Sequence, residues 1–203
     1  MATLTNNTSG ESPENQAISE VLWFWAALFD GPPSSEMGNT LNEDIWPLMQ
    51  ALTPHPLPPV AAGESLAQEY EEWLLIPYGD SPTSLYDEGA PDTNADTFNL
   101  WILAAILELP WQKETFAPNR AYPVRPDHLS VLLALWAILV TIPLDADLGG
   151  QTAEAWQNEV THSTLRILDR LSEALPPETT YHGLAVAAAD YAHQVQQWQA
   201  QGR

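Results

Sequence analysis

The chain has 203 residues, of which 45% are apolar, and a formal net charge of −21 at pH 7. A chain of this length typically forms one domain and buries about 70% of its unfolded surface, so its core needs neither a metal nor a disulfide. The absence of cysteine excludes disulfides, thiolate nucleophiles and zinc sites that use sulfur ligands.

The net charge comes from missing bases more than from added acids. The chain has 27 acidic residues and only 6 basic ones, and the first base is Lys113. Residues 1–112 carry 17 acidic residues and no Lys or Arg. Such a field repels nucleic acid and anionic lipid and attracts cationic segments. Adaptation to a saline habitat, or solubility alone, is an alternative origin of the same composition.

The N-terminal residues 1–14 are polar and predict a disordered tail, which leaves residues 15–203 as a single helical domain. No cationic start or apolar core typical of a secretory signal is present in residues 1–15. The longest apolar run, 129–142, is too short to span a bilayer. We therefore expect a cytoplasmic protein with no stable membrane insertion.

Apolar residues recur at helical spacing along most of the chain, and no stretch alternates with the period of a strand. The predicted helices are, in chain order, 16–29, 42–52, 64–76, 96–109, 127–140, 152–174 and 180–199. The fifth is apolar nearly all round, which predicts a central position, with Asp127 as its N-cap. The fold class expected is all-α, a single-domain bundle of about seven main helices.

Long irregular stretches separate some of these helices, and two of them carry related motifs. The first contains Pro82-Thr83-Ser84-Leu85-Tyr86, and the second contains Pro126-Asp127-His128-Leu129, about forty residues later. Long loops in compact domains are often functional. The first helix contains the aromatic, apolar stretch LWFWAALF.

In these features the chain resembles the TorD/DmsD/NarJ-type family of redox-enzyme maturation chaperones. Those proteins are all-helical and of similar length. They carry a P-x-x-S-[VL]-[YW] segment in mid-chain and an E-x-P-x-D-H-L-type segment that opens a core helix. The chain departs from that pattern at Val124 and Arg125, where the family usually has an acidic residue, and at 131–133, where it favours a Glu.

The resemblance implies a TorD-like fold and a cytoplasmic chaperone, a monomer or homodimer that is not an enzyme and holds no cofactor. Its partner would be the twin-arginine leader, or the N-terminal region, of a DMSO-reductase-type molybdoenzyme subunit. The chaperone would assist cofactor insertion, assembly and export timing. A twin-arginine leader joins a cationic stretch to an apolar one, and the base-free, aromatic first half of this chain suits such a ligand.

The expected peptide-binding residues lie mainly in the two motifs. They are Ser84, Tyr86, Pro126, Asp127 and His128, with Trp25 and Trp73 as apolar walls. Asp127 either pairs with a peptide arginine or serves only as a helix cap. Tyr86 and Ser84 either line a groove or anchor their loop, and the tryptophans either wall a groove or belong to the core. We expect the two loops to share one cleft.

Two alternatives remain open. Asp127 and His128 are a pair that a metal-dependent hydrolase could use, with His162 and Asp169 as further candidates. The chain has no phosphate-binding glycine loop and no G-x-S-x-G nucleophile motif, which disfavours other enzyme classes. The second alternative is a helical scaffold protein with a salt-adapted acidic surface.

Overall fold

The computed structural model describes residues 12–34, 38–39, 41–52, 56–58, 63–74, 83–87, 93–107 and 127–201. In chain order, the named elements of these residues are α1 (Pro13–Phe29), the π-helix η1 (Leu41–Ile45), α3 (Trp46–Leu52), α4 (Gly63–Trp73), α5 (Thr93–Ile106), α6 (Leu129–Leu139), α7 (Ala153–Ala174) and α8 (Thr180–Gln201). Within the described ranges no element is a strand, so the predicted all-α class is confirmed.

The first helix begins earlier than its apolar spacing predicted. Ser12 is the N-cap of α1 and accepts the N–H of Glu14 at 3.2 Å, with Pro13 in the first turn. A capping serine followed by proline and an acidic residue is a favourable helix start. The prediction of a tail reaching residue 14 was therefore wrong for residues 12–14. Residues 1–11 lie outside the described part of the chain.

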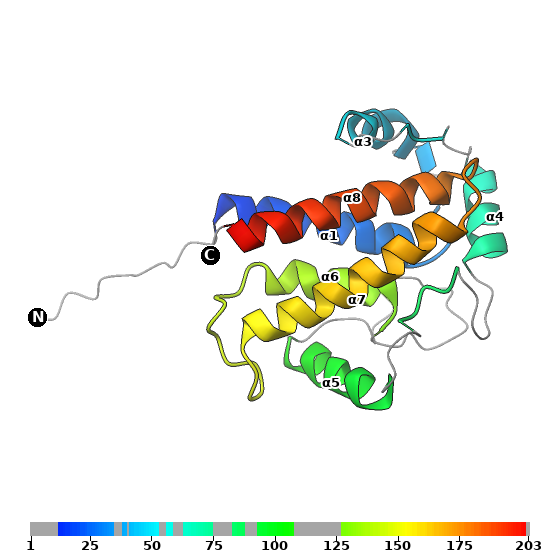
Figure 1. Ribbon diagram of the computed structural model, residues 1–203. Coiled ribbons are helices and arrows are strands. Elements are labelled where there is room, and N and C mark those ends of the chain that lie inside the picture. The colour runs from blue at the N-terminus through cyan, green and yellow to red at the C-terminus, as the bar shows by residue number, and fades with distance from the viewer. Residues whose placement is uncertain are drawn as a thin grey trace, which may run out of the picture.

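Helix α6 is the centre of the bundle, as its composition predicted. It packs between α1 and α7, and α7 packs in turn against α8 (Figure 1). Ten of its eleven residues are buried, including the fully buried Trp136. An apolar surface on every side leaves no face for water, so only neighbours on several sides stabilise this helix.

Two tyrosines bind the C-terminal end of α1 and hold α4 and α8 to it. The hydroxyl of Tyr70 in α4 donates to the carbonyl of Phe29 at 3.2 Å, and the hydroxyl of Tyr181 in α8 donates to the carbonyl of Leu28 at 3.4 Å. The two tyrosine rings meet edge to face, 5.5 Å apart. Carbonyls in the last turn of a helix have no intrahelical partner, so these bonds satisfy groups that burial would otherwise leave unpaired.

A carboxylate from α4 caps α8. Glu69 accepts the N–H of Thr180 at 2.8 Å. Burial raises the pKa of Glu69, and the hydrogen bonds from Thr180 and Tyr181 oppose that rise. A folded-state pKa above the unfolded one means that the folded protein holds this proton more tightly. The stability that Glu69 contributes is therefore present at acidic pH and is lost as the pH rises through its folded pKa.

The Glu69→Gln variant tests this linkage, because the amide still offers Thr180 an acceptor but does not titrate. We expect the stability of the wild type relative to the variant to fall as the pH rises from 4.5, the ordinary pKa of glutamate. Urea unfolding across a pH series measures the difference. Glu71→Gln, on the exposed face of α4, is the matched control. A flat or rising difference would contradict the assignment.

Candidate functional site

The two motif segments lie side by side. Tyr86 and His128 form an antiparallel β-bridge. Around it, the N–H of Leu129 donates to the carbonyl of Leu85 at 2.8 Å, and the N–H of Asp87 donates to the carbonyl of Asp127 at 3.2 Å. In Figure 1 the short green segment 83–87 runs beside the first turn of α6. We call the paired residues 83–87 and 127–130 the motif junction.

His128, not Asp127, caps α6. Its backbone is extended, with φ −74° and ψ 139°, and its Nδ1 accepts the N–H of Ser130 at 3.2 Å. The Ser130 hydroxyl lies 2.8 Å from the same Nδ1 and donates to a carboxylate oxygen of Asp30 at 3.0 Å. The prediction of Asp127 as N-cap was wrong because the bridge to 85–87 continues through Asp127 and delays the helix start.

Two arginines of α7 hold the first segment in place. The guanidinium of Arg170 donates to the carbonyl of Ser84 at 2.5 Å and to the carbonyl of Tyr86 at 2.8 Å. Arg166, one turn earlier, forms an ion pair with the carboxylate of Asp87 at 2.5 Å. Within the described ranges these are the only Lys or Arg residues, and both bind segment 83–87.

Sequence reasoning missed this arginine pair. The available signal was the i, i+4 spacing of two bases on one long helix in a chain that has almost none. What the spacing could not indicate was the partner, because both acceptors shown for Arg170 are backbone carbonyls of a distant loop. Every residue has a backbone carbonyl, so the residue types of a loop do not show which carbonyl accepts a hydrogen bond.

Most predicted site residues of the motifs are enclosed. The exposed fractions are 3% for Asp127, 5% for His128 and 7% for Ser84. Tyr86 is half-buried, and its ring meets the His128 ring edge to face at 5.0 Å. The structure therefore brings these four residues together at an interface between α6, α7 and segment 83–87.

The remaining predicted site residues lie elsewhere or outside the description. Trp25 is buried in the hydrophobic core on α1, and Trp73, at the end of α4, is half-buried against the same core. Pro126 lies outside the described residues. A shared peptide cleft between the two loops stays a prediction.

Metal-ligand chemistry is sparse at these positions. Among the described residues, no group of three or more His, Asp or Glu side chains is placed to hold a metal ion. Asp169, a candidate ligand for the hydrolase alternative, instead meets Nε2 of His193 at 3.1 Å on a half-exposed part of α7 and α8. His162 is exposed on α7.

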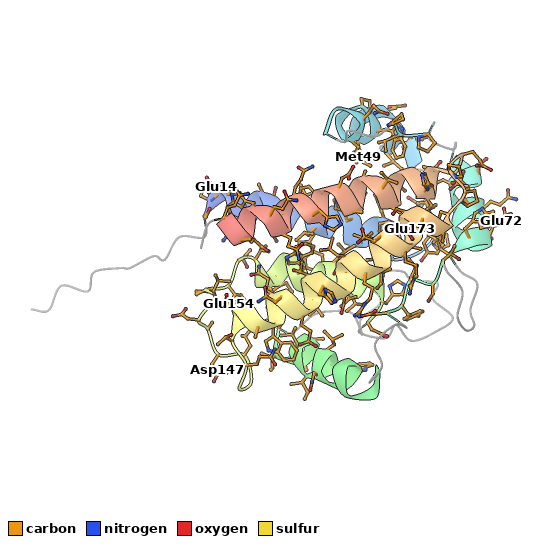
Figure 2. The ribbon with its side chains drawn as sticks, in the orientation of Figure 1. Glu14, Met49, Glu72, Asp147, Glu154 and Glu173 are labelled. Carbon is orange, nitrogen blue, oxygen red and sulfur yellow. The ribbon has the colours of Figure 1, made fainter. Side chains whose placement is uncertain are left out.

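Acidic side chains are distributed over the outside of the bundle. Figure 2 shows Glu72 on α4 and Glu173 near the end of α7 at one end of the view, and Asp147 and Glu154 near the start of α7 at the other end. In the described part of the chain, no helix has the length and apolar character needed to cross a membrane. Comparisons of the chain with protein-family models, with curated proteins and with solved structures find no match.

Proposed function

We propose that this protein is a maturation chaperone of the TorD/DmsD/NarJ type, and that it acts in the cytoplasm without catalysing a reaction. Its ligand is the twin-arginine leader or N-terminal region of a DMSO-reductase-type molybdoenzyme subunit. Binding delays export and assembly until the cofactor has been inserted. The fold is proposed to be TorD-like, and the protein to be a monomer or homodimer.

The observation that carries the proposal is the Tyr86–His128 bridge. The two segments that carry the family resemblance are far apart in the sequence, yet they form one hydrogen-bonded unit at the start of the central helix. If the two segments matched the family pattern only by chance, there would be no reason for them to pair with each other in the folded protein. The bridge therefore supports the interpretation that both segments belong to one motif of that family.

Charge supports the same choice of ligand. Both arginines within the described ranges already bind segment 83–87, while carboxylates lie on the outside of several helices. The surface carboxylates attract a cationic segment, and the two arginines compete little for them because both are bound to segment 83–87. An apolar stretch behind the arginines would add contact area that does not depend on salt.

Calorimetric titration tests the proposal directly. We expect a peptide with two adjacent arginines followed by an apolar stretch to bind with micromolar or tighter affinity, and to bind more weakly as the salt concentration rises. A peptide with both arginines replaced by glutamine is the control and should bind much more weakly. Absence of binding, or equal affinity for both peptides at every salt concentration, would refute the proposal.

A further inference from the structure

Two of the exposed large apolar side chains on the described surface lie next to each other on α5. The large apolar residues that are at least a third exposed are Val21, Ile102, Ile106, Leu144 and Trp198. Ile102 and Ile106 are exposed by 40% and 39% and lie one turn apart on the same face of α5. Leu144, exposed by 40%, belongs to the loop between α6 and α7 that contacts α5.

That loop is a hydrogen-bonded hairpin. Asp147 and Thr152 form an antiparallel bridge, and the N–H of Ala153 donates to the carbonyl of Ala146 at 2.8 Å. Gly149 and Gly150 turn the chain with positive φ of 74° and 94°, a region that favours glycine. The hairpin is therefore held together by its own hydrogen bonds.

Close packing joins the hairpin to α5. A Cβ placed on Gly149 would lie 2.6 Å from Cδ1 of Ile106, so only glycine allows this approach without a shift. Ile106 therefore lies against the hairpin at Gly149, and Ile102 lies one turn before it on α5. We call Ile102, Ile106 and Leu144, with Asp145 and Asp147, the α5–hairpin surface.

Acidic side chains border these apolar ones. Asp145 and Asp147 are exposed in the hairpin, and a carboxylate oxygen of Asp147 accepts the N–H of Gly150 at 2.7 Å. In Figure 2 Asp147 lies on the hairpin, in the part of the view where α5 is also drawn. The hydrogen bond orients one carboxylate next to the point where the hairpin meets Ile106. Apolar contact and negative charge therefore occur together at this surface.

We propose that the α5–hairpin surface is the docking site for the arginine-bearing leader, an inference that rests on the proposed function. The motif junction offers a ligand little, because Ser84, Asp127 and His128 are enclosed there. At the α5–hairpin surface, by contrast, the aspartates receive the arginines and the isoleucines receive the apolar stretch. A second copy of the chain would bring acids against acids at a net charge of −21, so charge favours a cationic partner.

Paired substitutions on the full-length protein test the site with the two-arginine peptide as probe. We expect Ile102→Gln with Ile106→Gln to weaken binding about tenfold, because both side chains lose apolar contact. Val21→Gln with Trp198→Gln is the matched control, since it removes apolar residues of comparable exposure on α1 and α8. The control should bind the peptide with the affinity of the wild type.

The charged half of the site has its own test. Asp145→Asn with Asp147→Asn removes both charges and leaves an oxygen for the N–H of Gly150. We expect weaker binding and a shallower dependence of affinity on salt, because fewer charges contribute. Glu71→Gln with Glu72→Gln, on the exposed face of α4, is the matched control and should change neither quantity.

The outcomes separate the two proposals. If the wild type binds the peptide and both α5–hairpin variants bind it equally well, this docking site is wrong and the proposed function stands. If the wild type does not bind, both are wrong. Thermal melting identifies a variant that has lost its fold, and the aspartate pair then decides the question if the isoleucine pair unfolds.

Discussion

Arg170→Met is expected to lower the free energy of unfolding by about 3 kcal/mol, because a charged donor to two carbonyls is removed. The carbonyl of Ser84 is on a buried residue, and methionine offers it no hydrogen bond. The methylene stem is kept, so the loss reports the guanidinium rather than packing. Urea denaturation measures the change. Glu173→Gln, exposed on the same helix, is the matched control and should have almost no effect.

The same variant should loosen the motif junction locally. The N–H groups of Leu129 and Asp87 are bonded across the bridge, so their hydrogen exchange reports whether the two segments stay paired. In Arg170→Met we expect these two amides to lose more protection than amides in the middle of α6. Equal loss at all of these positions would mean that Arg170 stabilises the whole fold and not the junction in particular.

Trp136→Ala is expected to cost about 3–5 kcal/mol of unfolding free energy, the usual cost of deleting a large buried aromatic side chain. Trp136 is fully buried on the central helix between α1 and α7, so neighbours on several sides would line the cavity. Chemical denaturation measures the loss directly. A loss below about 1 kcal/mol would mean that α6 is not the packing centre.

Trp136→Phe is the control for that cavity. Phenylalanine keeps most of the apolar volume and removes an indole N–H that is buried without an acceptor among the described residues. Removal of an unsatisfied buried donor offsets part of the lost packing. We therefore expect Trp136→Phe to lose much less stability than Trp136→Ala.

Burial limits what Asp127 and His128 could contribute to the proposed peptide binding. Asp127 and His128 sit at an interface of α6 with segment 83–87, where they order the start of the central helix. A substitution such as Asp127→Ala should lower melting temperature and peptide affinity together if its role is structural. Affinity that falls while the melting temperature is unchanged would instead indicate direct contact with the peptide.

Local signals in the sequence predicted several helix boundaries well. The helix from 152 to 174 was predicted from its apolar stripe, and the structure has α7 at Ala153–Ala174 with Thr152 as N-cap. The apolar run after His128 predicted a central helix, which is the position of α6. Both follow from interactions within a few turns of one helix, or from the need to bury a uniformly apolar surface.

Other features depended on contacts between distant residues. The cap of α6 shifted from Asp127 to His128 because residues 85–87 pair with 127–129, and nothing near Asp127 indicates that pairing. The partners of Arg170 were likewise hidden, since the two acceptors of its guanidinium are backbone carbonyls of a distant loop. The α5–hairpin surface arises because Gly149 admits Ile106 at close range.

The amino-acid sequence by itself determined the all-α class, the centrality of α6 and the strongly negative charge, because composition and helical periodicity act locally. Only the tertiary structure decided which motif groups are enclosed, which residue caps α6 and where apolar and acidic side chains meet on the outside. Those outcomes follow from hydrogen bonds and close packing between segments far apart in the chain, and local patterns do not record which distant segment becomes the neighbour.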